Sequence, residues 1–218
     1  MIITKYISEN VSSLSEQETI GKARQLMLDL GQTHIPIVNE EKLTGNISLN
    51  VVRNLNEKDT IKDHLIELEQ FYLFERAIIF DSIHVFSENE ANVIPIINTE
   101  GKFLGGVLEE TVVDEFASVP FILEFGVFMT VTTPIQKYSV SEIANIVESN
   151  NGKILGLIVI SIDEDTARIT LKIKTDNISS IGDTFERFGY QISNKYFEDS
   201  KQELLKDRFD QFRKFMEV

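Results

Sequence analysis

The 218-residue sequence contains no cysteine, and this absence excludes several kinds of chemistry. Without thiols the chain can form no disulfide, no thiolate metal site and no cysteine nucleophile. Chains without cysteine are compatible with a reducing compartment, and we therefore expect a cytoplasmic protein.

The sequence also lacks a long apolar run. Its most apolar stretch, residues 119–131, is interrupted by Glu124 and Gly126 and is too short to cross a bilayer. The first residues show neither the apolar region nor the small-residue cleavage pattern of a secretory signal. We therefore expect a soluble protein that does not contact a membrane.

Basic residues are scarce. Lys and Arg total 21 against 35 Asp and Glu, which gives a formal net charge of −14. This charge repels phosphate backbones and anionic headgroups over a screening length of about 10 Å, so binding of nucleic acid is not expected. A small anionic ligand remains compatible with the charge, because backbone N–H groups at helix N-termini can hold one.

Motifs of catalysis and of metal binding are missing as well. The chain has no G-x-S-x-G, Walker A, G-x-G-x-x-G or H-E-x-x-H pattern, and His64 and His84 have no partner at metal spacing. Residues 163–165 are acidic but lack the glycine and the glutamate of a calcium loop, which predicts a hairpin turn. We predict a protein that is not an enzyme and holds no metal; an enzyme with an unfamiliar site is the alternative.

What the sequence does contain is a repeat. Ile35-Pro36-Ile37-Val38-Asn39 is nearly repeated as Ile94-Pro95-Ile96-Ile97-Asn98, and a glycine follows each run. The same offset of 59 residues pairs Leu14 with Leu73. Each copy is predicted to fold as strand, helix, strand, strand, helix. One such unit leaves a sheet face bare, so the two copies are expected to pack against each other.

Both copies contain a helical stripe ahead of the proline. Apolar or small residues recur there every three or four positions, as in a helix that buries one face. The stripes consist of Ile20, Ala23, Leu26, Met27 and Leu30 in the first copy and of Ile79, Ser82, Ile83 and Phe86 in the second. Residues 39–42 and 98–102 are predicted as hairpin turns.

The second half of the chain has a different pattern. Strands are predicted at 126–132, 154–162, 167–173 and 190–197, with helices at 139–149 and 178–188. This βαββαβ order is ferredoxin-like. The final segment has an apolar stripe of Leu205, Phe209, Phe212 and Met216. We expect it to form an amphipathic helix that lies either on its own protein or on another subunit.

The repeated unit resembles the CBS domain, which occurs in tandem pairs. The resemblance rests on the two proline strands and on the stretches Gly45-Asn46-Ile47-Ser48 and Gly105-Gly106-Val107-Leu108. The second half resembles an ACT domain in its element order and in its Ser141-Glu142-Ile143-Ala144 helix opening. The whole chain is similar to acetoin-utilisation AcuB-type proteins.

The expected fold class is α/β (α+β). It comprises a CBS-domain pair, two βαββα units that share a cleft, followed by a ferredoxin-like βαββαβ ACT-like domain and a C-terminal amphipathic helix. The expected bounds are 1–56 and 57–118 for the CBS repeats, 126–197 for the ACT-like domain and 200–218 for the helix.

The resemblance also implies a function. CBS pairs are regulatory modules that bind adenosine-containing ligands between their repeats, and ACT domains bind amino acids or mediate dimerisation. We therefore expect no cofactor, a regulatory ligand such as AMP, ADP, ATP or S-adenosylmethionine, and a homodimer or higher homo-oligomer. The candidate ligand-binding residues are His34, Ile35, Pro36, Ser48, Val93, Ile94, Pro95 and Thr111.

This chain departs from the family pattern at informative positions. The family's ribose-binding aspartate is replaced by Val51 and by Thr111, which removes a charge-assisted hydrogen bond of about 1.5–3 kcal/mol. Ser48 keeps the family's hydroxyl in the first copy, whereas Leu108 replaces it in the second. Ser48 is expected either to contact a ligand or simply to cap the next helix, and His34 either to face the cleft or to be a core residue.

The second half departs from its pattern too, because Lys137-Tyr138-Ser139 stands where ACT domains usually have a glycine. This favours dimerisation over amino-acid binding. The alternative to a ligand sensor is a degenerate CBS/ACT scaffold that makes protein contacts and binds no small molecule.

Overall fold

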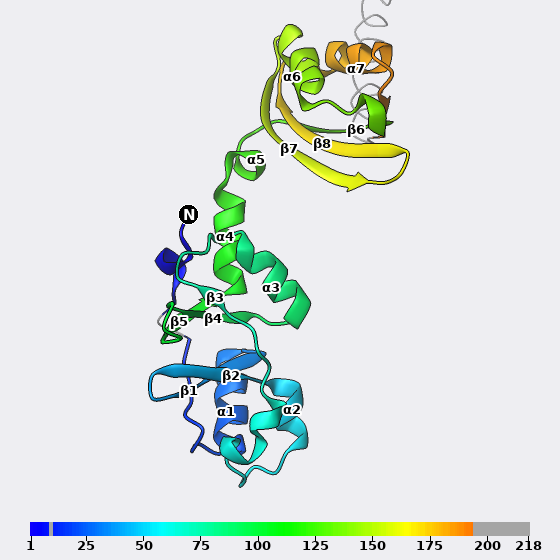
Figure 1. The fold of residues 1–218 in the computed structure, drawn as a ribbon. Helices are drawn as coiled ribbons and strands as arrows, with labels where there is room; N and C mark the ends of the chain where they lie inside the picture. Colours follow the sequence, from blue (N-terminus) through cyan, green and yellow to red (C-terminus); the bar gives the residue numbers. More distant parts are fainter. Residues whose placement is uncertain (9–10, 194–218) are drawn as a thin grey trace, which may run out of the picture. The chain divides into compact units, whose positions relative to one another are not determined.

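The computed structural model describes residues 1–8 and 11–193. The predicted helix at 200–218 and the end of the strand predicted at 190–197 lie outside the described residues. The chain divides into two compact units, unit 1 (Met1–Ala117) and unit 2, which begins at Ser118 (Figure 1). None of the described helices has the length and apolar character needed to span a bilayer.

The first copy of the repeat begins after the short 3₁₀ helix η1 (Ile3–Tyr6). Its elements are α1 (Ile20–Leu30), β1 (His34–Asn39), β2 (Lys42–Ser48) and α2 (Leu49–Asn54). The Thr19 hydroxyl caps α1 by accepting from the Lys22 N–H at 3.2 Å, and Gly31 ends it with a φ of 65°. The loop of the β1–β2 hairpin consists of Glu40 and Glu41, whose φ angles of 46° and 67° belong to a tight hairpin turn.

The second copy follows a 3₁₀ segment, η2 (Ile61–Glu67). Its elements are β3 (Leu73–Phe74), α3 (Asp81–Asn89), β4 (Val93–Ile97), β5 (Phe103–Leu108) and α4 (Glu109–Ser118). Leu73 pairs in parallel with Ile96, and Leu14 forms the equivalent bridge to Ile37. The leading strand predicted for the first copy is thus reduced to a single bridge, which corrects the prediction of a full strand there.

The segment ahead of each copy forms backbone hydrogen bonds with the other copy. The segment ahead of the first copy bonds to the second, since the Ser8 N–H donates to the Gly106 carbonyl at 2.8 Å. The segment ahead of the second copy bonds to the first, because Asn46 and Glu69 exchange two backbone hydrogen bonds of 2.8 and 2.9 Å. Gly45 leaves room for this crossing, since a Cβ added there would lie 2.9 Å from the Leu68 Cβ.

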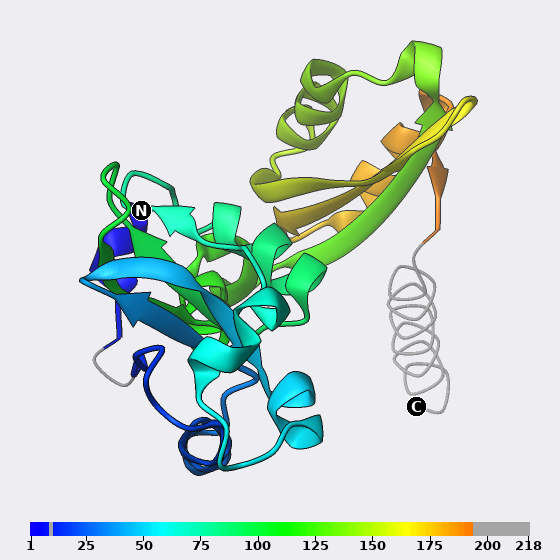
Figure 2. The ribbon, with the colours of Figure 1, turned by 60° about the horizontal axis from the view of Figure 1, so that its bottom comes forward.

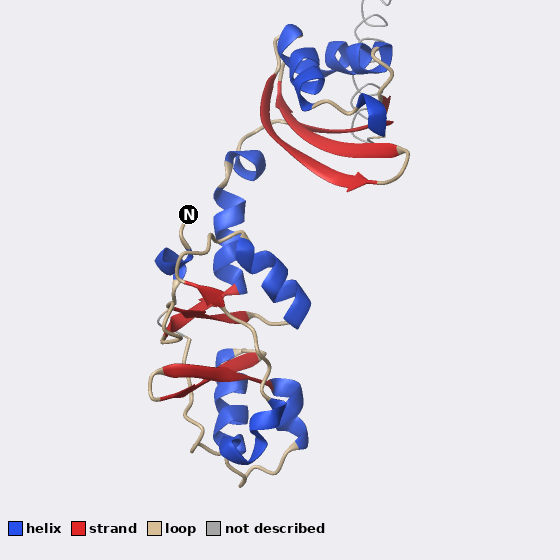
Figure 3. Ribbon diagram, viewed as in Figure 1, coloured by secondary structure: helices blue, strands red, loops and turns tan. Residues whose placement is uncertain are grey.

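The hairpins also meet at their tips. The Leu43 N–H donates to the Gly101 carbonyl at 3.2 Å, and at the equivalent positions the Phe103 N–H donates to the Glu41 carbonyl at 2.8 Å. The first hairpin (blue) lies beside the strands of the second copy (green) in two views (Figure 1 and Figure 2). Figure 3 shows these strands together, with helices of each copy outside them. The predicted packing of the two copies is therefore present.

Unit 1 has one buried cluster for each copy. The first comprises Leu14, Ile20, Ala23, Met27, Ile35, Ile37, Ile47, Val52, Ile61 and Leu68. The second comprises Ile3, Phe71, Ile79, Phe86, Ala91, Ile94, Ile96, Val107 and Val112. Two stripe residues predicted to be buried are not, because Leu30 and Ile83 are 41% and 43% exposed.

Unit 2 has the predicted βαββαβ order. After α5 (Pro120–Leu123) come β6 (Val127–Pro134), η3 (Ile135–Lys137), α6 (Val140–Ser149), β7 (Lys153–Ile162), β8 (Thr166–Lys174), α7 (Ile178–Arg187) and β9 (Gln191–Ile192). The strands form an antiparallel sheet in the order β7-β8-β6-β9. The Ser139 hydroxyl caps α6 by accepting from the Glu142 N–H at 3.3 Å. Phe188, predicted on the buried stripe of its helix, lies past the end of α7 and is 49% exposed.

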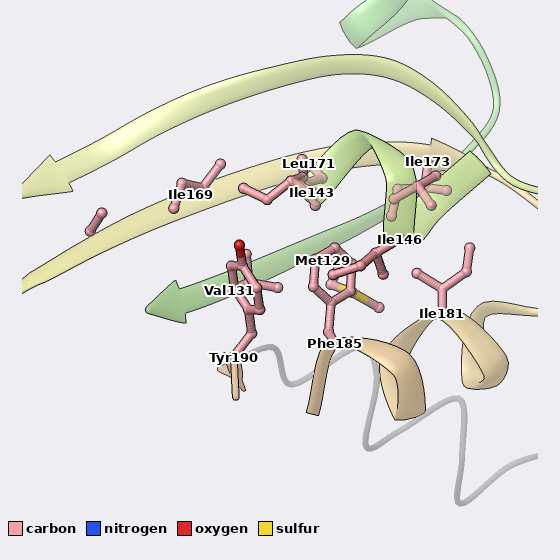
Figure 4. Close-up of a cluster of buried hydrophobic side chains, with 12 residues drawn as sticks. Met129, Val131, Ile143, Ile146, Ile169, Leu171, Ile173, Ile181, Phe185 and Tyr190 are labelled. Carbon is pink, nitrogen blue, oxygen red and sulfur yellow. The ribbon is translucent and has the colours of Figure 1, made fainter. Parts of the chain in front are cut away.

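Helices α6 and α7 cover one face of this sheet and enclose its core (Figure 4). Tyr190 closes the core, since its ring packs edge-on against Phe185 and its hydroxyl donates to the Glu142 carboxylate at 2.9 Å. Burial, together with this carboxylate, raises the pKa of the Tyr190 hydroxyl. On the sheet's opposite side, Phe121 of α5 packs against Gly156.

Candidate functional site

Thr33 and Asn92 occupy equivalent positions just ahead of β1 and β4, and they bind each other. The Thr33 N–H and hydroxyl donate to the Asn92 side-chain oxygen at 2.8 and 3.0 Å, and the Asn92 N–H donates to the Thr33 hydroxyl at 2.9 Å. The Asn92 amide also donates to the Gly31 carbonyl at 2.8 Å. This pair fixes the centre of unit 1, around which its pockets lie.

One pocket lies between the start of β1, the start of α2 and the end of α3, with a volume of about 500 Å³. We call it the Ser48 pocket. It takes residues from both copies: Thr33, His34, Ser48, Leu49, Asn50 and Arg53 from the first, Glu69 from the segment ahead of the second, and Glu88, Asn89 and Glu90 from the second. Its size is within the range of small-molecule sites.

When the two copies are interchanged, the position equivalent to the Ser48 pocket holds a smaller pocket of about 370 Å³, here called the Leu108 pocket. It lies between the end of α1 and the start of α4, which correspond to the end of α3 and the start of α2. Its lining includes Asp29, Leu30, Gly31, Gln32, Asn92, Leu108, Glu109 and Glu110. The duplicated fold therefore provides two related pockets with different chemistry.

A third pocket, of about 580 Å³, lies between α3 and α4 and has apolar walls that include Ile83, Phe86, Val112 and Val113. In the first copy the corresponding space holds Arg24, which stands at the position of Ile83. Arg24 donates to the Val52 and Leu55 carbonyls at 2.6 and 3.1 Å and so joins α1 to the end of α2.

His34 is held on three sides at the edge of the Ser48 pocket. Its Nε2 lies 3.3 Å from the Glu69 carboxylate, its Nδ1 lies 2.9 Å from the Thr33 hydroxyl, and Phe71 packs edge-on against its ring. The residue is 4% exposed. Burial lowers the pKa of its imidazole, and the Glu69 carboxylate opposes this effect in part. His34 is thus a buried residue that also lines the Ser48 pocket, and its contact with a ligand stays a prediction.

Ser48 caps a helix, which is one of the two roles predicted for it, while its contact with a ligand stays a prediction. Its hydroxyl accepts from the Val51 N–H at 3.4 Å and caps α2, and the residue lines the pocket while being buried. Val51, at the position of the family's aspartate, is half-buried and packs against the first core cluster.

The remaining candidates lie away from the three described pockets. Four are buried in β1 and β4, namely Ile35, Pro36, Ile94 and Pro95, and Val93 is buried at the start of β4. Thr111 is half-buried on α4. Among the described residues none of these six lines the Ser48 pocket or the other two.

Sequence reasoning missed several polar and charged residues of the Ser48 pocket. Arg53 and Asn50 stand five and two positions after Ser48 in α2, and this spacing was available as a signal. Glu88 and Glu90 come from the other copy, so that only the packing of the two copies brings them here. No group of three or more metal-ligating side chains is found among residues 1–8 and 11–193.

Comparison with known proteins bears on unit 1. Residues 3–54 match the family model of the CBS domain. The homoserine O-acetyltransferase of Methanococcus vannielii is 30% identical over 117 residues, which are 51% of this chain and 24% of that protein. That of Methanosarcina acetivorans is 23% identical over 114 residues, or 21% of its length. The chain thus spans about a quarter of the curated relatives that it matches.

Solved structures show a similar extent of likeness. A CBS domain pair/ACT domain protein from Thermotoga maritima is 13% identical and covers 53% of this chain and 96% of its own, with a TM-score of 0.49. The CBS domains of a transcriptional regulator from Streptococcus pneumoniae are 14% identical, with coverage of 52% and 98% and a TM-score of 0.46. CBSX2 in complex with AMP is 14% identical, with coverage of 54% and 97% and a TM-score of 0.44.

The second copy, although outside the matched residues, repeats the helix, the hairpin and the parallel pairing of the first. Unit 1 therefore has the fold of a CBS domain pair.

Proposed function

We propose that this protein is a non-catalytic regulatory protein of the cytoplasm, in which unit 1 binds an adenosine-containing ligand in the Ser48 pocket. The observation that supports this most is the position of Ser48. Its hydroxyl stands where the CBS resemblance places a ligand hydroxyl, and it lines a pocket of about 500 Å³. Asn50 and Arg53 add side-chain donors to the same wall.

The pocket is suited to regulation because both copies line it. A ligand that touches α2 of the first copy and the end of α3 of the second binds best to one arrangement of the copies. By such differential binding it shifts the population toward that arrangement. We propose that the resulting change is read out by assembly or by a target protein and not by a chemical reaction.

For unit 2 we propose an ACT-like dimerisation or effector role. The sheet side opposite α6 and α7 includes Phe128 of β6 and Ile158 of β7, which are 39% and 41% exposed. Apolar side chains at such positions favour contact with another protein surface. Light scattering of the full chain at micromolar concentration is expected to give at least a dimer; a monomer would contradict this role.

The test of the ligand proposal is titration of the full chain with adenosine, AMP, ADP, ATP and S-adenosylmethionine, followed by calorimetry and thermal unfolding. A ligand at one hundred times its Kd should stabilise the protein by about 2.7 kcal/mol. Ser48→Ala should weaken binding roughly tenfold, which corresponds to the loss of one hydrogen bond to the ligand. Ser48→Thr, which keeps hydroxyl and cap, should bind normally.

Leu108→Ala is the matched control, because Leu108 occupies the same position in the other pocket. It should leave the affinity unchanged. Each variant is compared with its own ligand-free form, since Ser48→Ala also removes the cap of α2.

The second candidate function is a scaffold that binds proteins and no small molecule. Val51 favours it, because its apolar side chain packs toward the core where the family has a ribose-binding carboxylate. Absence of a thermal shift with every adenosine derivative would support the scaffold. The aligned quarter of the homoserine O-acetyltransferases gives no basis for proposing acetyl transfer here.

A further inference from the structure

The two related pockets of unit 1 share an excess of carboxylates. Glu69, Glu88 and Glu90 line the Ser48 pocket together with one cation, Arg53. The Leu108 pocket is lined by Asp29, Glu109 and Glu110, and no described residue of its lining is basic. A ligand bound in either pocket would therefore be surrounded by an excess of negative charge.

The pockets also adjoin one another, which extends this field. The pocket between α3 and α4 shares Thr33 and Glu90 with the Ser48 pocket, and it shares Asn92 and Glu109 with the Leu108 pocket. A ligand in the Leu108 pocket faces carboxylates from both copies, whereas the carboxylates of the other two pockets come from the second copy and from the segment ahead of it. His34 does not offset this charge, because its imidazole is buried beside Glu69 and favours the neutral form.

This charge acts directly on the affinity of phosphates. A carboxylate and a phosphate charge about 8 Å apart repel each other enough to weaken binding about two- to sixfold, for effective dielectric constants of about 80 to 40. The effect grows with each added phosphate. Arg53 can offset part of it for a single anionic group, because a guanidinium binds such a group with two parallel hydrogen bonds.

We propose that the Ser48 pocket selects adenosine derivatives that carry no net negative charge, and that its preferred class is the cationic, zwitterionic kind represented by S-adenosylmethionine. This deepens the function proposed above and depends on it. Arg53 binds the single carboxylate of such a ligand. Glu88 and Glu90, from the other copy, stabilise its ammonium and sulfonium groups. AMP and ATP carry no cationic group for Glu88 and Glu90 to stabilise. Their phosphate charge is therefore repelled by these carboxylates and is offset only in part, by Arg53.

The lining of the Leu108 pocket predicts one ligand per chain. Leu108, at the position equivalent to Ser48, has no hydroxyl, and the described lining contains no guanidinium to bind a carboxylate. A zwitterionic ligand therefore finds its full set of partners in one pocket of the pair.

The test is isothermal titration of the full chain with S-adenosylmethionine, its uncharged-sulfur analogue S-adenosylhomocysteine, AMP, and ATP with and without Mg²⁺. S-adenosylmethionine should bind at least about tenfold more tightly than ATP, with one site per chain and with S-adenosylhomocysteine between the two. Added salt should weaken binding of S-adenosylmethionine and strengthen that of ATP, because it screens both interactions.

A charge variant locates the effect. Glu88→Gln combined with Glu90→Gln should weaken binding of S-adenosylmethionine about threefold to tenfold and should strengthen that of ATP. Glu100→Gln with Glu164→Gln changes the net charge equally at exposed turn residues and should alter neither affinity.

The outcomes separate this inference from the proposed function. If no adenosine derivative binds, the proposed function fails. If AMP or ATP, alone or with Mg²⁺, binds as tightly as S-adenosylmethionine, the charge selection is wrong while the ligand function stands. If the pocket variant behaves like its control, Glu88 and Glu90 do not act on the ligand and the inference is overturned.

Discussion

At the scale of single residues, the imidazole of His34 links protonation to the stability of unit 1. It is buried beside Glu69 and Phe71, and burial lowers its pKa below the value of about 6.5 expected for the unfolded chain. Between the lowered folded pKa and about pH 6.5 the unfolded chain therefore binds more protons. This contribution to stability is fully present above about pH 6.5 and is lost as the pH falls through the folded pKa.

We expect that His34→Gln reduces the loss of unfolding free energy between about pH 7.5 and pH 5, because it removes this titration. Urea unfolding at a series of pH values measures the effect. His84→Gln is the control, since that side chain is 77% exposed. Equal pH dependence in the His34 variant and the parent would contradict the assignment.

A second prediction concerns the pair at the centre of unit 1. Asn92→Ala removes the side chain that binds Thr33 and the Gly31 carbonyl. Because the partners are partly buried, we expect a loss of about 1–3 kcal/mol of unfolding free energy. Asn54→Ala, which removes one exposed bond within α2, should have a much smaller effect in the same denaturant titration.

The sequence allowed part of the Ser48 pocket to be predicted at this scale. Ser48 and His34 were identifiable because they stand at the end of β2 and the start of β1, the two strands that carry the repeated motif of the first copy. Arg53, Glu88 and Glu90 were not, since charged residues on helix faces look like ordinary solvated surface in a sequence. Their meeting depends on contacts between copies that no local pattern encodes.

At the scale of elements, the two copies differ in how their helices are joined. The guanidinium of Arg24 in α1 donates to the carbonyls of Val52 and Leu55 at the end of α2, where such groups lack helical partners. It also pairs with Glu57. The second copy has Ile83 at this position, and a pocket lies there between its helices.

Arg24→Met should therefore lower the unfolding free energy of unit 1 by about 1–3 kcal/mol, because it leaves partly buried carbonyls without a donor. Chemical denaturation monitors the change. Lys22→Met is the control, because its ion pair with Glu18, just ahead of the same helix, is exposed and contributes little. A loss no larger than that of the control would show that Arg24 does not join the helices.

The periodicity of the sequence identified the elements better than it identified their burial. It predicted α1 and the helices of unit 2, because the apolar spacing there matches a single covered face. It placed Ile83 in the core, whereas this residue lines the pocket between α3 and α4. A stripe shows that one side of a helix is apolar, but the width of the covered part depends on the neighbouring helix.

At the scale of the whole molecule, each buried cluster found among residues 1–8 and 11–193 belongs to one unit. The two clusters of unit 1 and the cluster of unit 2 have no residue in common. Within unit 1 the two copies, each with its own cluster, are joined by the backbone hydrogen bonds between Ser8 and Gly106 and between Asn46 and Glu69. Unfolding of the two units should therefore respond separately to core substitutions.

We expect Ile181→Ala, in the core of unit 2, to lower the unfolding free energy of that unit by about 2–5 kcal/mol while leaving the transition of unit 1 in place. Ile47→Ala should do the reverse. Differential scanning calorimetry with both variants distinguishes the transitions. A single transition that moves equally in both would show that the units unfold together.

The segments ahead of the two copies cross, and this crossing determines what happens when the chain between the copies is cut. Ser8, ahead of the first copy, is bound by the hairpin of the second copy. Glu69, ahead of the second copy, is bound by the hairpin of the first, so each copy holds the leading segment of the other. Proteolytic nicking of the connection between α2 and η2 would consequently leave an interlocked heterodimer of fragments. The two copies thus have the topology of a domain-swapped dimer whose subunits are joined into one chain. Separately expressed halves should therefore reassemble, with each half pairing its leading segment with the other.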